Sequence, residues 1–126
     1  MSTQKYQIKI DVTSRYLPDQ SEPGANRFAY AYTIKIQNTG MVATQLISRH
    51  WVIKDENGGH VEVKGLGVVG HQPLLRPGEH FEYTSGSQIA TAVGSMEGSY
   101  FFVAEDGFRF DATIPGFALT MPRTLH

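Results

Sequence analysis

Phe28-Ala29-Tyr30-Ala31-Tyr32-Thr33-Ile34-Lys35-Ile36 carries the clearest structural signal in this chain. Its large side chains fall on every second residue and alternate with Ala, Thr and Lys. Successive side chains of a β-strand point to opposite sides, so a period of two predicts a strand with one buried face. Asn38-Thr39-Gly40 is typical of the turn that would end it. We therefore predict a strand over residues 28–36 with Tyr32 in the core.

The same alternation recurs on both sides of this strand. Further strands are predicted over about residues 6–12, 44–54, 60–64, 81–84, 96–104 and 108–114, and Phe117 with Leu119 adds a last one after a bend at Pro115-Gly116. Turn-forming residues separate them. Asn57-Gly58 predicts a type I′ hairpin turn, and Ser85-Gly86-Ser87 is expected to end a strand. Residues 88–94 fit either an extended segment or a short helical turn.

The predicted strand over residues 44–54 has two mixed faces. Alternation places Ile47, Trp51 and Ile53 on one face together with Arg49, and Leu46 on the other. A strand of this kind is typical of the middle of a sheet whose ends emerge from the core. We expect Trp51 to be buried.

Four further positions carry expectations about packing. Val61 and Val63 should point inward from the strand over residues 60–64, and Phe108 should do so from the strand that follows Glu105-Asp106-Gly107. Gly98 occupies one of the inward-facing positions of the predicted strand over residues 96–104, which is rich in aromatic residues. We expect it to leave space for a neighbouring ring.

Seven or eight short strands, turns every eight to twelve residues and no helical period predict an all-β fold. Each strand has one apolar face to bury, which favours two antiparallel sheets packed face to face as a β-sandwich. A closed barrel is the alternative. With 126 residues, the chain is expected to form a single domain over residues 1–126.

Composition excludes several functional classes. Eleven Lys and Arg against twelve Asp and Glu give a net charge of −1, scattered along the chain, which argues against nucleic-acid binding. The absence of Cys excludes disulfides and thiolate chemistry. No apolar run has the length of a signal peptide or a membrane span, so we expect a cytoplasmic protein without membrane insertion.

A set of short motifs resembles the bacterial ApaG family over nearly the whole chain. They are Arg49-His50-Trp51, the run from Gly65 to Pro73, Leu75-Arg76-Pro77-Gly78, Tyr83-Thr84-Ser85-Gly86, Met96-Glu97-Gly98-Ser99-Tyr100, Ile114-Pro115 and Pro122-Arg123-Thr124-Leu125-His126. The resemblance implies a fibronectin type III-like or immunoglobulin-like sandwich. It also implies a link to cobalt tolerance and magnesium efflux, and an interaction domain like the one in eukaryotic F-box proteins. Leu66 departs from the acidic residue that family members often carry there.

Gly65, Gly67 and Gly70 spell G-x-G-x-x-G, the pattern of a dinucleotide-binding loop. That fingerprint needs a helix directly after its third glycine, and Pro73 leaves no room for one. Two readings remain. The glycines shape an irregular connection between strands, which we favour, or they form with Arg76 a site for a small anion such as pyrophosphate or a nucleotide.

Histidines and carboxylates supply the candidate metal ligands. Alternation turns His60 and Glu62 outward on one strand and His80 and Glu82 outward on another, and these four would converge if the strands paired. We favour a solvated outer face over a metal site and predict no cofactor. His50 is expected to be partly buried and hydrogen-bonded.

No catalytic residue is predicted. Thr84-Ser85-Gly86 lacks the strand-to-helix elbow of a nucleophilic serine. We expect a non-enzymatic binding module that contacts a protein partner of unidentified sequence or a small anion, as a monomer or a homodimer. The alternative is an accessory protein in divalent-cation homeostasis; a nucleotide hydrolase or transferase comes third.

Overall fold

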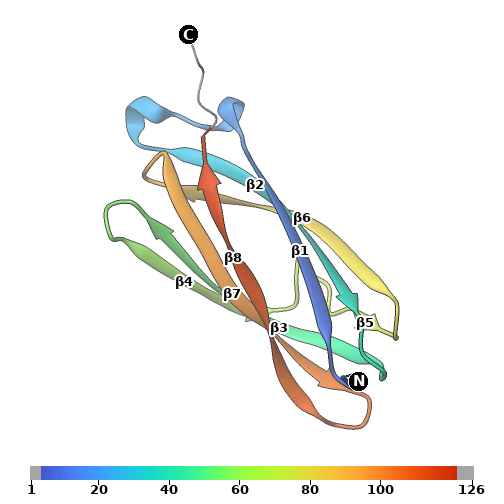
Figure 1. Cartoon of the computed structure of the whole chain (residues 1–126). Coiled ribbons are helices and arrows are strands. Elements are labelled where there is room, and N and C mark those ends of the chain that lie inside the picture. The colour runs from blue at the N-terminus through green and yellow to red at the C-terminus, as the bar shows by residue number, and fades with distance from the viewer. Residues whose placement is uncertain (1–3, 122–126) are drawn as a thin grey trace.

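The computed structural model describes residues 4–121, and they form two antiparallel sheets packed as a β-sandwich (Figure 1). The three-stranded sheet has the order β1-β2-β6, and the five-stranded sheet has the order β4-β3-β7-β8, with β5 also pairing with β3. The strands are β1 (Ile8–Tyr16), β2 (Phe28–Asn38), β3 (Thr44–Asp55), β4 (His60–Leu66), β5 (Leu74–Leu75), β6 (His80–Ile89), β7 (Val93–Ala104) and β8 (Arg109–Thr120). Two short 3₁₀ turns, η1 (Pro18–Gln20) and η2 (Pro23–Ala25), connect β1 to β2. The predicted antiparallel sandwich is confirmed, and the sheets do not close into a barrel.

Aromatic side chains from both sheets meet in the core. Trp51 on β3 lies with its ring centroid 5.5 Å from Tyr32 on β2 and makes edge contacts with Tyr100 at 6.3 Å and Phe117 at 5.9 Å. Trp51 is 2% exposed and Tyr32 is 6% exposed. Both were predicted to be core residues from strand alternation, and both are.

A buried pair of hydroxyls also joins the two sheets. Tyr83 on β6 and Tyr100 on β7 lie with their phenolic oxygens 2.5 Å apart. Burial raises the pKa of both phenols well above the ordinary tyrosine value. Both phenols are therefore uncharged, and one hydroxyl donates a hydrogen bond to the other inside the core.

The alternation of side chains along β3 is interrupted near the start of the strand. The pairing of β3 with β7 shifts register between Leu46 and Ser48, as a β-bulge does. Leu46 is consequently fully buried on the core side with Trp51, although strict alternation had put them on opposite faces. Ile47, expected to share the face of Trp51, is only half-buried.

Two turn predictions were wrong. β6 runs through Ser85-Gly86-Ser87 to Ile89, because its pairing with β2 continues in register along the whole segment. Within residues 88–94, β6 ends at Ile89, residues 90–92 form a bend, and β7 begins at Val93. In the loop after β3, only Gly58 has positive φ, so Asn57-Gly58 is not a type I′ turn. The Asp55 carboxylate instead accepts the N–H groups of Asn57 and Gly59.

Three expectations about side chains were also wrong. Val61 is 59% exposed, because β4 is an edge strand and this side chain borders an open groove of about 310 Å³ between β4 and the end of β6. Phe108 is 47% exposed and stacks on Tyr6 at 4.0 Å rather than entering the core. Gly98 makes room for the backbone of β3, not for a ring.

The chain does not bend away at Pro115-Gly116. β8 passes through both residues and carries Phe117 and the buried Leu119 to Thr120. The pairing of β7 with β8 shifts register between Met96 and Gly98, opposite the segment that contains Pro115. A proline is tolerated there because a bulge does not require its missing N–H. Among the residues described, no helix is long and apolar enough to cross a membrane.

Candidate functional site

The glycine-rich segment after β4 forms a tight reverse turn. Val68 and His71 exchange two backbone hydrogen bonds, of 2.8 and 2.9 Å, and leave Val69 and Gly70 between them. Val69 has φ +42° and Gly70 has φ +82°. Positive φ at both central residues is the signature of a type I′ turn. The turn predicted for Asn57-Gly58 is therefore found at Val69-Gly70, where no Asn-Gly marks it.

The backbone donors of this turn are largely engaged. The N–H of Gly67 donates to Ile47 O at 2.8 Å, and those of Val68 and His71 bond each other's carbonyls. Below the turn, Val68 is fully buried and holds the segment to the core. An anion nest needs successive free N–H groups, and three of the donors in this segment already bond to backbone.

Arg49 is the cation that contacts the glycines. Its Nη1 donates to the carbonyls of Leu66 at 3.0 Å and Gly67 at 2.9 Å. Arg49 also pairs across the strands with Gly65, where an added Cβ would lie 2.9 Å from Nη1. Gly65 thus admits the guanidinium over the backbone. The sequence showed both residues but not the register that joins them.

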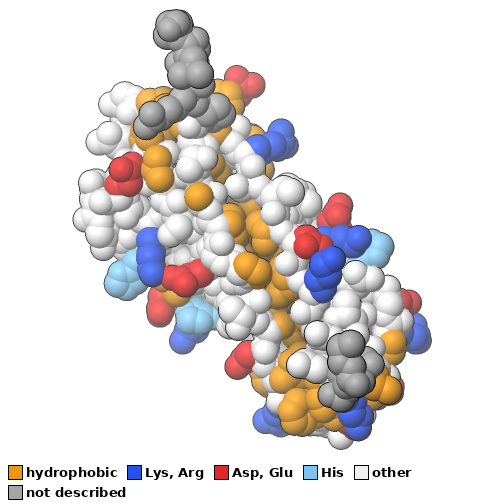
Figure 2. Space-filling view, in the orientation of Figure 1, with side chains coloured by type: hydrophobic (Ala, Val, Ile, Leu, Met, Phe, Trp, Pro, Cys, Tyr) orange, Lys and Arg blue, Asp and Glu red, His pale blue; other side chains and the backbone are white. Residues whose placement is uncertain are grey.

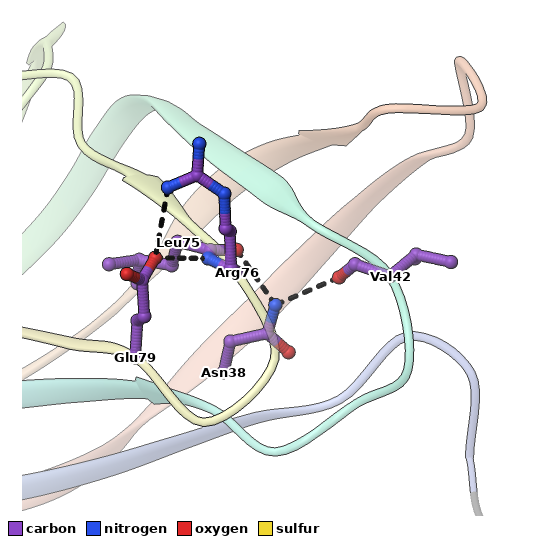
Figure 3. A network of polar contacts seen from close by, with 5 residues as sticks. All are labelled: Asn38, Val42, Leu75, Arg76 and Glu79. Atoms are coloured by element: carbon purple, nitrogen blue, oxygen red, sulfur yellow. Dashed lines mark hydrogen bonds and ion pairs between the residues drawn. The ribbon is translucent and has the colours of Figure 1, made fainter.

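Arg76 lies in a separate turn between β5 and β6 (Figure 3). Its backbone N–H donates to Glu79 Oε1 at 2.7 Å, and its Nη1 lies 3.9 Å from the same oxygen. Asn38 anchors this turn by donating to the carbonyls of Val42 and Leu75 at 2.8 and 2.9 Å. Of the four predicted anion-site residues, the three glycines share one segment, whereas Arg76 lies in another turn beside Glu79.

The four candidate metal ligands are divided between the sheets. His60 and Glu62 lie on β4, and His80 and Glu82 lie on β6. Within residues 4–121, β4 pairs only with β3 and β6 pairs only with β2. All four are exposed, as predicted. In residues 4–121, no group of three or more His, Asp or Glu side chains gathers around one point.

His50 is half-buried on β3, as expected, and its Nε2 has no hydrogen-bond partner. This atom is covered from solvent and lies 3.6 Å from Glu62 Oε1. Sequence alternation could not reveal this cross-strand neighbour, because the two residues are twelve positions apart and meet only through the β3–β4 register.

A depression of about 500 Å³ lies over the outer face of the five-stranded sheet. Strands β3, β4, β7 and β8 all contribute to its lining, which includes Arg49, His50, Lys64, Leu66, Phe101 and Asp111. Leu66 is 74% exposed, the largest exposure among the large hydrophobic residues described. Figure 2 shows charged side chains of both signs, with histidines, gathered on the side of the molecule where β4 lies. The depression thus combines apolar contact area with positive and negative groups.

Comparison with known proteins agrees with this architecture. The family model of the ApaG domain matches residues 18–104 of the chain. The chain belongs to the ApaG family. Protein ApaG of Thiobacillus denitrificans is 65% identical over 122 residues, which cover 97% of this chain and 96% of that protein. Protein ApaG of Ralstonia nicotianae is 62% identical, with coverage of 97% and 98%.

A solved structure of a similar protein has the same fold. The ApaA protein of Bordetella pertussis superposes with a TM-score of 0.94 at 50% identity, and the match covers 98% of this chain and 100% of that one. The family resemblance drawn from the sequence motifs is therefore confirmed.

In this ApaG chain, Gly67→Ala is expected to lower the free energy of unfolding by about 2 to 4 kcal/mol, because the new Cβ meets both a positive φ and backbone atoms. Gly67 has φ +65°, and an added Cβ would overlap the His71 carbonyl oxygen. Gly70→Ala is the control: φ is +82° but no atom lies within 4 Å, so only about 1 kcal/mol is expected. Urea denaturation of both variants measures the difference. Equal losses would contradict the steric argument.

Val69→Asn is expected to stabilise the ApaG fold by about 1 kcal/mol, because Asn tolerates the left-handed conformation that a β-branched residue resists. Val69 is 51% exposed, so little packing is lost. The control is Val93→Asn, at a 41% exposed valine that begins β7 without positive φ. Urea midpoints should rise for Val69→Asn and stay level or fall for Val93→Asn. A lower midpoint for Val69→Asn would mean that the turn does not strain Val69.

Proposed function

We propose that the protein is a non-enzymatic binding module of the ApaG family that takes a protein partner on the outer face of its five-stranded sheet. The observation that carries this proposal is the depression over β3, β4, β7 and β8, with the highly exposed Leu66 at its border. The outer face of a sandwich sheet is ordinarily solvated and polar. Apolar groups that remain on such a face favour a contact surface.

The composition of this depression suits a protein partner. Leu66 and Phe101 offer apolar area, and Lys64 and Asp111 offer opposite charges near them. Protein interfaces combine an apolar centre with a polar rim, and charges of both signs at the rim select among partners. We expect a partner with a complementary arrangement of apolar and charged side chains.

The hydroxyl groups of Thr84 and Ser85 support the non-enzymatic part of the proposal. Thr84 lies in the middle of β6, and its Oγ1 is hydrogen-bonded to Thr33 Oγ1 at 2.8 Å. Ser85 follows it on a strand that is regular through Ile89. A reactive serine of the elbow type sits on a sharp turn between strand and helix, and this segment has the geometry of a paired strand instead.

The experiment that tests the proposal places a photo-crosslinking amino acid at Asp111 or, as a matched control, at Asp11. Asp111 lines the depression, whereas Asp11 is an exposed aspartate on β1 of the other sheet. Irradiation in cells should give discrete protein adducts at position 111 and none of the same size at position 11. A purified partner should then bind the parent chain and Asp11→Lys equally, and Asp111→Lys more weakly. Adducts at both positions, or equal binding by both variants, would overturn the proposal.

One contact favours the alternative role in divalent-cation homeostasis. The His50 imidazole and the Glu62 carboxylate, 3.6 Å apart, are both metal-ligand types. Calorimetric titration with cobalt and magnesium tests this role separately. We expect no stoichiometric site; tight cobalt binding that His50→Ala removes would favour the alternative. A parallel titration with pyrophosphate, followed by amide NMR, tests the glycine segment for anion binding.

A further inference from the structure

β4 is an open edge of the five-stranded sheet. Among the residues that the structure describes, its seven residues pair on one side only, with β3, in continuous register and without a bulge or proline. At the other end of the same sheet, β8 lies beside β1, where Ser14 Oγ donates to Ala118 O at 3.1 Å. An open edge presents unpaired N–H and C=O groups that can take another strand. Two exposed apolar residues, Val61 and Leu66, lie on this strand.

The phase of the β3–β4 ladder shows which backbone groups face the open side. Asp55 N–H donates to Gly59 O at 3.0 Å beyond one end of the pairing, and Gly67 N–H donates to Ile47 O at 2.8 Å beyond the other. Hydrogen-bonded pairs alternate with non-bonded pairs along an antiparallel ladder. Between these two ends, the odd-numbered residues of β4 therefore bond to β3. The N–H and C=O groups of His60, Glu62 and Lys64 face the open edge. So does the N–H of Leu66, whose carbonyl already accepts from Arg49 Nη1 at 3.0 Å.

Among the centres that pair most of β4, at Glu62, Val63 and Lys64, the charges of the strand select one pairing with a second copy. Two identical strands related by a two-fold axis pair antiparallel about a central residue. A centre at Glu62 would oppose two carboxylates, and a centre at Lys64 would oppose two ammonium groups, both of which are unfavourable. A centre at Val63 opposes Glu62 to Lys64 twice. If the two-fold axis passed between two residues instead of through one, residues from opposite faces of β4 would be paired. The core-facing side chains of one copy would then lie on the outer face of the joined sheet.

The register centred on Val63 is also compatible with the backbone groups and side chains along the open edge of β4. It pairs the backbone groups of Glu62 with those of Lys64, which are among the groups that face outward. It sets Val63, which is half-buried, against its own copy, and Val61 against Gly65, which has no side chain to obstruct it. Leu66 falls opposite His60. β6, the other open edge, carries Glu82 but no Lys or Arg to oppose it.

We propose that the protein forms a homodimer by antiparallel pairing of β4 with β4 of a second copy, in the register centred on Val63. The four-strand path from β8 to β4 continues into the second copy as one sheet. Edge pairing of a seven-residue strand buries a small area, so the dimer belongs to the weak, concentration-dependent class.

The test is sedimentation velocity over a range from low to high micromolar protein, with charge-reversed variants. The parent chain should shift from monomer to dimer as concentration rises. Glu62→Lys places Lys opposite Lys, and Lys64→Glu places Glu opposite Glu, so each variant alone should stay monomeric. Mixed together they should form a heterodimer, because each Lys then faces a Glu. The double variant Glu62→Lys/Lys64→Glu should dimerise like the parent chain.

The control is Glu82→Lys, which reverses the same charge on the other open edge and should leave the dimer unchanged. Amide exchange gives a second measurement that does not depend on any variant. The N–H groups of Glu62 and Lys64 should gain protection as concentration rises, whereas those of Val61 and Val63 should not change. A parent chain that is monomeric at every concentration would overturn the proposal. So would a dimer that survives both single reversals, or one that Glu82→Lys abolishes.

Discussion

Gly98→Ala is expected to lower the free energy of unfolding by at least about 3 kcal/mol, which is the upper end of the cost of overpacking because the obstruction is backbone. Gly98 pairs with Trp51 on β3 and lies beside the bulge between β7 and β8. An added Cβ would overlap the carbonyl oxygen of His50 and lie 3.2 Å from the Cα of Trp51. Neither atom can move without opening the β3–β7 pairing, which holds the middle of the larger sheet.

Gly116→Ala is the matched control, at a glycine of β8 on the other side of the same bulge. An added Cβ there would lie 3.8 Å from Glu97 Cβ and from Met96 O, which is ordinary contact. Its effect should stay within about 0.5 kcal/mol, as for most surface substitutions. Guanidinium or urea melts of the two variants provide the comparison, with expression as insoluble protein counting as the extreme loss for Gly98→Ala. A Gly98→Ala protein as stable as the control would mean that β3 and β7 lie further apart.

Trp51→Ala is expected to cost about 3 to 5 kcal/mol, the range for truncating a large buried aromatic residue. The indole contacts Tyr32 from the smaller sheet and Tyr100 and Phe117 from the larger one. Its removal would leave a cavity lined by three rings that cannot collapse without moving strands. This is the only tryptophan of the chain, so unfolding must be followed by far-ultraviolet circular dichroism rather than by its fluorescence.

Phe108→Ala serves as the control for aromatic truncation. Phe108 is 47% exposed and stacks on Tyr6 outside the core, so about 1 kcal/mol is expected. If Trp51→Ala cost no more than this control, the packing of the two sheets around the indole would have to be looser than the ring distances indicate.

The two proposals concern neighbouring parts of one surface. Pairing through β4 would place the depressions of two copies on the same continuous sheet, side by side across the two-fold axis. A partner that engages both would gain avidity from the dimer. Asp111 tests the partner surface and lies on β8, whereas Glu62, which does not line the depression, tests the edge on β4. Failure of one proposal therefore leaves the other standing.

Local alternation was enough to predict the sandwich. The run Phe28–Ile36 lies in the middle of the smaller sheet, with Tyr30, Ile34 and Ile36 almost fully buried. Trp51 was placed correctly for the same reason, since strand periodicity places each side chain on one face of its own strand without reference to other strands. The expectation that no helix follows the glycine segment is confirmed, because a proline close behind it prevents a helix whatever the rest of the chain does.

The wrong predictions concern residues whose burial or contacts depend on pairing with a second strand. The bulge beside Ile47 turned Leu46 into the core, and the edge position of β4 left Val61 exposed. Arg49 reached Gly65, and His50 came close to Glu62, only through the β3–β4 register. Gly98 is required by a carbonyl of β3, 48 residues earlier in the chain at His50. Periodicity along one strand determines which side of a sheet a residue takes, but register, bulges and edge position depend on pairing between distant segments. The sequence alone therefore determined the fold class and most of the core, and the tertiary structure decided which side chains meet at the surface.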